Sequence, residues 1–405
     1  MIRKKPQVLM YFVNALFWTT VYVYVPQFSD YIKHDIGATA TMVGLIAGSY
    51  GVTQMLLRLP LGIWSDRLSR RKPFILAGIA MGGLSSLVMF FFARSPGALL
   101  IGRLLAGLAA CAYVQISILF SSYFEGKQHS MGFVEGSTAA GQLLAMLVGG
   151  VVAQAYGYRY TFLAAAALAL VGLALAAFAT ESRKARSPIS LGAVGGTIRE
   201  KTLVVAAVLA IFAQAINFGK GFVFAPMAAA AFHATNLELS ALTMCFMLPT
   251  AALAPFAATK LAPRVGFRPM VAAGFVLQAL SCAMVPFATG MGWMYLSQFM
   301  TGLGSALTFP ALMALCVSKM PDEKRATAMG FYQAVYGIGI FAGPYLTGWL
   351  TDWLGASPAF AINGVMAGLA AAGALVFIAG TAGRKMINDS QLPCPASPPQ
   401  GSAPH

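Results

Sequence analysis

The sequence predicts an all-α membrane protein of twelve transmembrane helices, arranged as two six-helix halves related by pseudo-symmetry. Three observations predict this fold: the composition, the spacing of the apolar runs and an internal repeat. Of the 405 residues, 58% are hydrophobic and only 10% are charged, whereas a soluble domain carries about 25% charged residues. The core of such a chain is set by the thickness of a bilayer rather than by one globular interior.

Apolar runs of about 20 residues, the length that crosses a bilayer, occur twelve times along the chain. The first run is interpreted as a retained span rather than a signal peptide, because it is long and no small-residue cleavage site follows it. The predicted spans cover approximately residues 8–28, 41–63, 73–92, 97–120, 131–153, 160–179, 203–227, 239–258, 270–288, 293–317, 329–350 and 358–379.

The placement of lysine and arginine predicts the orientation of the spans. Most of the 27 such residues flank the spans on the side of the N-terminus, so the positive-inside rule predicts that both termini are cytoplasmic. Because these cations are spread over loops rather than gathered on one face, the net charge of +15 does not indicate nucleic-acid binding. The exceptions lie in loops on the far side (Lys33, Arg94, Arg159) or within spans (Arg58, Arg103, Lys220).

The internal repeat divides the chain into two halves. Met131-Gly132-Phe133 recurs as Met329-Gly330-Phe331, and Gly141, Gly150 and Phe162 recur at the same offset of 198 residues. A duplicated six-span unit is typical of transporters whose halves rock about a central site. We therefore predict an N-terminal half (1–180), a cytoplasmic linker (181–202), a C-terminal half (203–385) and a disordered, Pro- and Ser-rich tail (386–405).

A basic loop, Gly62 to Lys72, separates the second and third spans. It resembles the signature of the major facilitator superfamily, Gly-x-x-x-Asp-Arg-x-Gly-Arg-Arg, with Ser69 where the family usually has glycine. The resemblance covers nearly the whole chain and implies that family's twelve-helix fold and transport by alternating access. The corresponding loop of the second half, residues 259–269, has Pro263 in place of the acid.

The resemblance implies that this loop gates transport and does not bind substrate. Gly62 is expected to let helices two and eleven approach closely, and Asp66 is expected to face the positive N-terminal end of helix eleven. Because the second loop lacks the acid, the gate is predicted to be asymmetric. The alternative is that the cations only set the orientation. The predicted gating residues are Gly62, Asp66, Arg67, Arg70 and Arg71.

Span four contains Arg103 near its outer end, and Arg103 to Ala109 is similar to the family element Arg-x-x-x-Gly-x-Gly. In proton-coupled members this element lies near the coupling site. The alternative is an arginine that snorkels to the outer surface. Span five lacks the Gly-Pro pair typical of drug/proton antiporters, which weakens that assignment. Arg58, one turn before Gly62, is expected to support the signature loop.

The family's cavity is lined by helices one, four, seven and ten, and that arrangement is carried over to this chain as an implication of the resemblance. Aromatic residues among the candidates can equally be core residues. Lys220, between two glycines inside span seven, is a functional candidate because an ionisable residue within a membrane is costly. The other cavity candidates are Asn14, Trp18, Tyr22, Tyr113, Gln115, Gln214, Asn217, Gln298, Thr301, Ser305 and Thr308.

Of the twelve carboxylates, only Glu135 falls within a predicted span, about one turn from its end. No carboxylate is predicted at the bilayer centre, where proton-coupled transporters usually keep one. Together with the three cations inside spans, this favours either an anionic or zwitterionic substrate, or coupling through Glu135 or Asp30.

The leading hypothesis is proton-coupled export of a drug or metabolite across a bacterial inner membrane by a monomer. The alternative within transport is an organic-anion or phospho-compound carrier that uses Arg103 and Lys220, in which replacing Lys220 abolishes anion transport. A lipid flippase shares the same features. A transport-inactive sensor is disfavoured, because the predicted tail is shorter than the soluble domain such sensors usually carry. No enzyme motif, metal site or cofactor site is found, and the four histidines are isolated.

Overall fold

The computed structural model describes residues 4–68, 70–124, 127–181 and 199–378. Every regular element among them is a helix, which confirms the predicted all-α membrane fold. Most of the predicted linker and all of the predicted tail lie outside the described residues, and so does the side chain of Asp66.

Six helical stretches form the first half, and two of them are broken into shorter helices. The first stretch consists of α1, α2 and a π-helix, and the fourth of α5 and α6. Their bounds are α1 (Lys4–Tyr22), α2 (Val25–Asp30), η1 (Tyr31–Asp35), α3 (Ala40–Leu68), α4 (Lys72–Phe91), α5 (Pro96–Ala110), α6 (Tyr113–Ser121), α7 (Lys127–Tyr156) and α8 (Arg159–Ala177).

Six further stretches form the second half. Its first stretch passes through a π-helix, a wide turn that often marks a functional segment. The bounds are α10 (Lys201–Ile216), η2 (Asn217–Phe224), α11 (Ala225–Ala229), η3 (Ala230–Phe232), α12 (Asn236–Phe256), η4 (Ala257–Leu261), α13 (Ala262–Val265), α14 (Phe267–Met284), η5 (Val285–Phe287), α15 (Met291–Val317), α16 (Asp322–Leu354) and α17 (Ala356–Phe377).

Within the described chain, eleven helical segments are long and apolar enough to cross a membrane. They correspond to every predicted span except the eleventh, residues 329–350. That span lies inside α16, whose 33 residues would measure about 50 Å at 1.5 Å per residue. Its length therefore suffices, but glycine, tyrosine and glutamine residues in its middle make it less apolar than the others.

The sequence repeat is also a repeat of contacts. The Thr53 hydroxyl in α3 donates to Leu104 O in α5 at 3.0 Å, and the Thr250 hydroxyl in α12 donates to Gly302 O in α15 at 3.1 Å. Thr53 and Thr250 occupy corresponding places in the two halves. Each pair holds the second helix of its half against the fourth.

Two glycines end corresponding helices. Gly157 follows α7 and Gly355 follows α16, and both have φ of +92°, a conformation that glycine adopts without the steric cost of a Cβ. They are separated by the same 198 residues as the repeat. The repeat therefore fixes where the fifth helix of each half ends.

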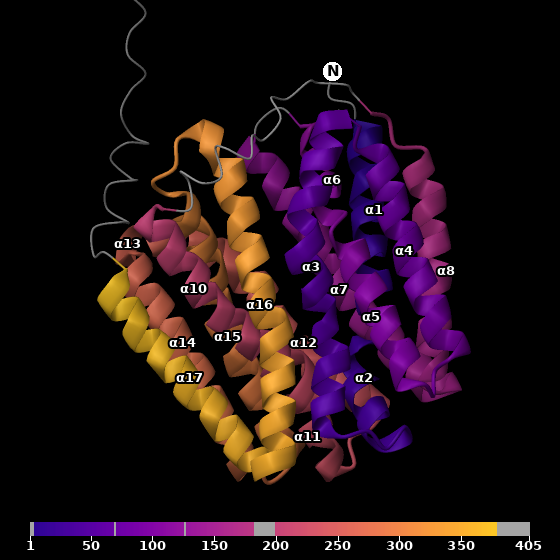
Figure 1. Ribbon diagram of the computed structural model, residues 1–405, viewed down its shortest axis with the longest axis vertical. Coiled ribbons are helices and arrows are strands. Elements are labelled where there is room, and N and C mark those ends of the chain that lie inside the picture. Colours follow the sequence, from indigo (N-terminus) through magenta and orange to yellow (C-terminus); the bar gives the residue numbers. More distant parts are fainter. Residues whose placement is uncertain (1–3, 69, 125–126, 182–198, 379–405) are drawn as a thin grey trace, which may run out of the picture.

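The two halves lie side by side, and α3 and α16 run together where they meet (Figure 1). Gly44, Gly48 and Gly51 face α16 along this contact, and an added Cβ at Gly48 would lie 2.7 Å from Phe341 O. The expectation that Gly62 permits this approach is wrong, because a Cβ there would meet nothing within 4 Å. The close contact lies farther from the signature loop, where small residues allow the backbones to touch.

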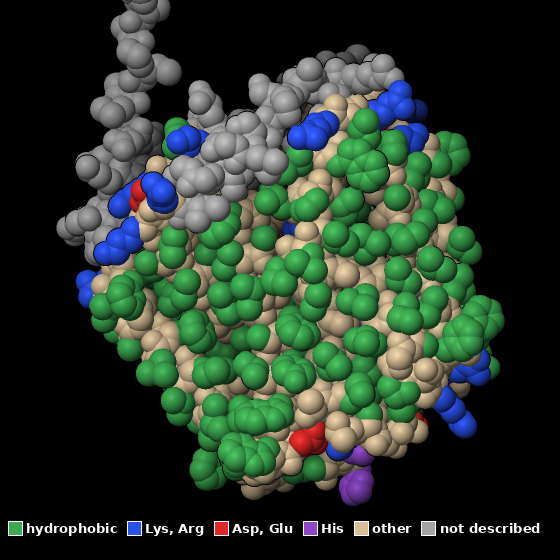
Figure 2. All heavy atoms as spheres, viewed as in Figure 1, with side chains coloured by type: hydrophobic (Ala, Val, Ile, Leu, Met, Phe, Trp, Pro, Cys, Tyr) green, Lys and Arg blue, Asp and Glu red, His purple; other side chains and the backbone are tan. Residues whose placement is uncertain are grey.

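Large apolar side chains cover the outer surface of the bundle between its two ends (Figure 2). Such a belt suits contact with lipid, since soluble proteins rarely expose large contiguous apolar areas. One end, called the basic end below, carries the start of α1, the signature loop, the start of α10 and α13, with Lys5, Arg67, Arg70, Lys201 and Arg264. The other end, called the opposite end, carries α2 and α11 (Figure 1).

Candidate functional site

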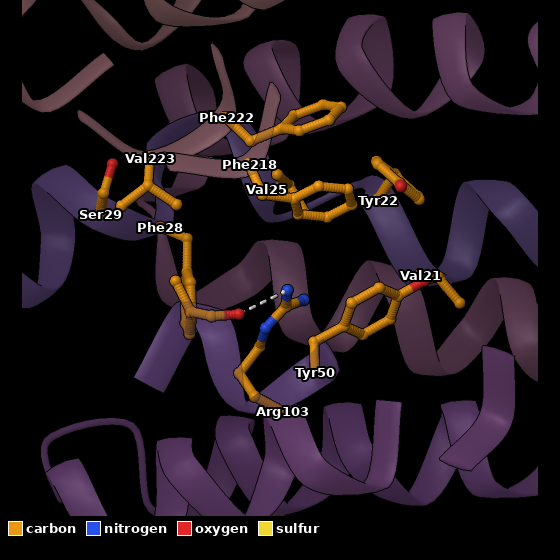
Figure 3. A pocket seen from close by; sticks show the side chains of 11 residues that line it. Val21, Tyr22, Val25, Phe28, Ser29, Tyr50, Arg103, Phe218, Phe222 and Val223 are labelled. Carbon is orange, nitrogen blue, oxygen red and sulfur yellow. Dashed lines mark hydrogen bonds between the residues drawn. The ribbon is translucent and has the colours of Figure 1, made fainter. Parts of the chain in front are cut away.

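A cavity lies between the two halves, on the side of the opposite end. Its walls come from the first, second and fourth stretches of one half and from η2 of the other (Figure 3). Its volume is about 20 Å³, room for about one water. The residues that line it are Val21, Tyr22, Val25, Phe28, Ser29, Ala47, Tyr50, Arg103, Phe218, Phe222 and Val223.

Arg103 is the only cation in the lining of this cavity. Ser95 caps the start of α5 and Pro96 opens it, which places Arg103 two turns into the helix. Its side chain is 5% exposed, so it does not snorkel to the surface. The guanidinium donates to Ala47 O at 3.2 Å and to the Tyr24 hydroxyl at 3.4 Å.

Aromatic rings surround the Arg103 guanidinium. Its central carbon lies 4.7 Å from the ring centre of Tyr50, 5.5 Å from that of Phe28 and 5.9 Å from that of Tyr24, and Figure 3 shows it directed at the Tyr50 ring. Rings at these distances stabilise a cation. Nε has no hydrogen-bond partner, and no carboxylate among the described residues forms an ion pair with Arg103. The site is a desolvated cation without a counter-ion.

Aromatic contacts between the halves close the cavity. Tyr22 meets Phe222 edge to face with ring centres 5.6 Å apart, and Tyr50 stacks on Phe218 at 6.2 Å. Phe222 also packs against Phe246 in α12 at 5.0 Å. Each contact that joins the halves must separate if a larger solute is to occupy the cavity.

The opposite end is fastened at two places. The Gln27 side chain in α2 donates to Ser240 Oγ and to Asn236 O in α12, both at 2.8 Å. Asp352 in α16 accepts from the backbone N–H groups of Ala40 and Thr41 at the start of α3, at 2.9 and 2.7 Å. Contacts between α2 and α12 and between α16 and α3 therefore seal the cavity from this end.

The Asp352 carboxylate lies past the predicted span, in the last turn of α16. Partial burial raises its pKa, but the hydrogen bonds from Thr41 and Ala40 outweigh that effect and hold the pKa below its usual value. The contact is therefore present at neutral pH and is lost only when the pH falls through this lowered pKa.

Two of the predicted cavity residues, Tyr22 and Arg103, line this cavity. Asn14 instead faces α7, where its amide donates to Ser137 Oγ at 2.7 Å. Trp18 lies beside Tyr22 and Tyr113, with ring centres 5.6 and 5.1 Å away. Gln115 is buried in α6. Whether these residues contact a solute in another conformation stays a prediction.

The candidates of the second half make buried polar contacts among α10, η2, α14 and α15. Asn217 donates to Ser305 Oγ at 3.1 Å and to Gln214 Oε1 at 3.2 Å, and Gln278 donates to Asn217 at 3.3 Å. Gln298 donates to Gly221 O at 2.7 Å. The remaining candidates, Thr301 and Thr308, are also fully buried.

Lys220 does not line the cavity. Its side chain is 0% exposed, and Nζ donates to Ser297 O at 3.0 Å, to Ser297 Oγ at 2.8 Å and to the Thr301 hydroxyl. All three acceptors belong to α15, so Lys220 joins η2 to α15 inside the second half. Its role in substrate binding stays a prediction.

Glu135 accepts a hydrogen bond from the Tyr113 hydroxyl at 2.9 Å. This contact joins α7 to α6 on the basic side of the cavity, and the Glu135 side chain is exposed. Asp30, the other predicted coupling residue, pairs with His34 at 2.7 Å near the opposite end.

The signature loop is held by the end of the first half. Glu181 accepts from the backbone N–H groups of Arg71 and Lys72, and Lys72 Nζ donates to Ala177 O at 2.6 Å. Ser65 donates to Arg70 O at 3.1 Å. The predicted contact of Asp66 lies outside the described side chains, so the gating role of this loop stays a prediction.

Sequence reasoning missed most of the aromatic lining, namely Phe28, Tyr50, Phe218 and Phe222. The signal available was the spacing of four between Phe218 and Phe222, beside the candidate Lys220. It also assigned Arg58 to the signature loop, whereas Arg58 donates to the Tyr336 hydroxyl of the other half at 2.8 Å. The sequence offers no cue to that partner.

Comparison with known proteins matches this chain to a family of transporters. The family model described as Major Facilitator Superfamily matches residues 8–227 and 203–393. An uncharacterized MFS-type transporter of Methanocaldococcus jannaschii is 22% identical over 335 residues, covering 79% of this chain and 84% of that protein. A multidrug transporter protein of Bacillus subtilis, MdtP, is 27% identical over 122 residues, covering 30% of this chain and 22% of that protein.

Among solved structures, the nucleoside transporter NupG superposes with a TM-score of 0.77, covering 92% of this chain and 98% of NupG. The two sequences are only 12% identical over this match. The likeness therefore concerns the fold and leaves the solute of this chain open.

Proposed function

This chain belongs to the Major Facilitator Superfamily, and we propose that it is a secondary transporter that carries a small organic anion with an aromatic or apolar body by alternating access. It acts as a monomer in the cytoplasmic membrane of a bacterium, with both termini and the basic end in the cytoplasm. The distribution of lysine and arginine supports this orientation. In that orientation, the described conformation is closed toward the outside.

The burial of Arg103 without a carboxylate partner among the described residues is the observation that supports the proposal. A buried cation in a membrane protein is costly unless a partner compensates it, and here the described residues supply rings and a carbonyl but no carboxylate. An anionic solute would supply the missing charge. A hydrogen bond to a charged group contributes about 1.5–3 kcal/mol, and the surrounding rings would hold an aromatic body.

The first test compares anions with neutral molecules of the same shape. Benzoate and benzenesulfonate should raise the unfolding temperature of the purified protein in lipid nanodiscs, and benzamide and benzenesulfonamide should not. A ligand at 100 times its Kd stabilises the folded state by about 2.7 kcal/mol. Arg103→Gln should remove the effect of both anions, and Arg103→Lys should keep part of it.

Arg159 provides a matched control. It also lies over a ring, 4.7 Å from the centre of Phe90, and donates to Phe90 O at 2.9 Å, but it is exposed at the opposite end. Arg159→Gln should respond to the anions as the unchanged protein does. Equal stabilisation by anions and amides, or an undiminished response in Arg103→Gln, would contradict the proposal.

Proton-coupled export of a drug or metabolite is the second candidate. The contact between Glu135 and Tyr113 favours it, because it places a carboxylate, a group that can carry a proton, against a residue of the fourth stretch. The name of the Bacillus subtilis relative, a multidrug transporter, agrees with export.

The two candidates differ in their dependence on protons. For proton-coupled export, adding the solute to inverted vesicles should release protons from the acidified interior, and Glu135→Gln should abolish that release while the solute still binds. Solute flux without any proton movement would leave the anion carrier as the function.

A further inference from the structure

A second arginine lies buried between the halves, nearer the basic end. Arg58 stands eleven residues after Ala47, the carbonyl partner of Arg103, on the same helix. Eleven residues make about three turns, so the two positions share a face of α3 and lie about 16 Å apart along its axis. Tyr50, whose ring centre lies 4.7 Å from the Arg103 guanidinium carbon, belongs to the part of α3 between them.

The surroundings of Arg58 repeat those of Arg103. Its side chain is 5% exposed, one terminal nitrogen donates to the Tyr336 hydroxyl at 2.8 Å, and Nε has no partner. No carboxylate among the described residues pairs with it. Each site thus combines a buried cation, a tyrosine hydroxyl and an unused N–H donor.

Aromatic rings also wall the Arg58 site. Tyr336 packs edge to face against Phe309 with ring centres 5.8 Å apart and against Tyr332 at 5.5 Å. The Tyr332 hydroxyl is buried without a hydrogen-bond partner. Two unsatisfied polar groups therefore lie in one aromatic cluster, where leaving them unpaired is costly.

We propose that Arg58 is a second anion-binding residue, on the basic side of the aromatic contacts that close the cavity, so that the carried anion meets Arg58 and Arg103 in succession. This inference rests on the proposed anion carrier. Arg58 would offer a solute released by Arg103 a second counter-charge about 16 Å farther along α3, so that the solute does not cross the whole interface to the basic end unpaired.

The competing role for Arg58 is a latch, because its bond to Tyr336 joins the halves. The two roles can be distinguished by removing the Arg58 charge and its hydrogen bond to Tyr336 separately. Arg58→Gln removes the charge, Arg58→Lys keeps it, and Tyr336→Phe removes the hydroxyl partner while leaving the cation in place.

The test measures binding and flux of benzenesulfonate, which stays ionised and does not cross a bilayer unaided. Binding is read from the unfolding temperature in nanodiscs and flux from uptake by proteoliposomes. Arg58→Gln should keep the stabilisation that depends on Arg103 but lose flux by at least about tenfold. Arg58→Lys and Tyr336→Phe should each retain at least about threefold more flux than Arg58→Gln, and Arg159→Gln should match the unchanged protein.

The outcomes distinguish this inference from the proposed function. Full flux in Arg58→Gln, or equal losses in Arg58→Gln and Tyr336→Phe, overturns the second site while the Arg103 site stands. If Arg103→Gln also keeps its stabilisation, the proposed function itself fails. As a folding control, the unfolding temperature of Arg58→Gln is measured without ligand. If it equals that of the unchanged protein, a loss of flux is not caused by misfolding.

Discussion

Gly48→Ala is expected to open the opposite end of the protein and to slow transport. The new methyl group would lie 2.7 Å from Phe341 O in α16, and a backbone oxygen cannot move aside without shifting its helix. Such overpacking costs about 1–3 kcal/mol, a change of about five- to 150-fold in the population of the closed form. Labelling of Ser29→Cys by a membrane-impermeant maleimide, in a background without the native cysteines, should increase.

Gly136→Ala is the matched control, because an added Cβ at Gly136 in α7 meets nothing within 4 Å. The same chemical change there should leave labelling and flux unaltered, and it favours the helix by up to about 1 kcal/mol. Ser29 is buried in the closed cavity, so its labelling reports access to that cavity. Unchanged labelling in Gly48→Ala would show that α3 and α16 do not set the closure.

Lys220→Ala is expected to destabilise the second half strongly, whereas Lys220→Met should not. Alanine leaves a void and removes the three hydrogen bonds to Ser297 and Thr301, and large-to-small changes in a core cost about 2–5 kcal/mol. Methionine fills the same space without a buried charge, a replacement that is often neutral or stabilising. Thermal unfolding of the purified variants measures the difference.

Lys319→Ala serves as the surface control, since Lys319 is exposed and lies 4.0 Å from Glu200. Exposed ion pairs contribute little to stability. If Lys220→Met unfolds as the unchanged protein does but no longer responds to benzenesulfonate, Lys220 contacts the solute, as the alternative anion-carrier hypothesis from the sequence predicts. A response equal to that of the unchanged protein assigns Lys220 to the packing of η2 against α15.

The fold could be predicted because its two signals extend over the whole chain, namely apolar runs of bilayer-crossing length and the 198-residue repeat. A run of apolar residues needs no knowledge of its neighbours to be recognised as a span. The exception is α16, which is less apolar than the other spans and whose glycines pack closely against both α3, at Met55, and α10, at Ala215. The close contact lies along Gly44, Gly48 and Gly51 rather than at Gly62, since sequence shows small residues but not which helix faces them.

The site could be predicted only in part. Arg103 and Tyr22 followed from the cost of a buried cation and from the family's arrangement of helices. Lys220 and Asn217 were candidates because the family's seventh helix lines the cavity and because Lys220 is an ionisable residue within a span. Both lie in the π-helix η2, whose wider turn changes which side chains face the cavity. Phe218 and Phe222 line the cavity instead; their spacing of four indicates a shared face but not that this face meets the cavity.

The two fastenings at the opposite end have a consequence for leakage. Gln27 joins α2 to α12 and Asp352 joins α16 to the start of α3, so the halves are fastened to each other at two separate places. Neither half can tilt away from the other while either fastening is intact. Breaking only one fastening therefore costs free energy and permits little movement. We therefore expect the two to break together, as one switch, which keeps partly opened forms rare and guards the membrane's ion gradients.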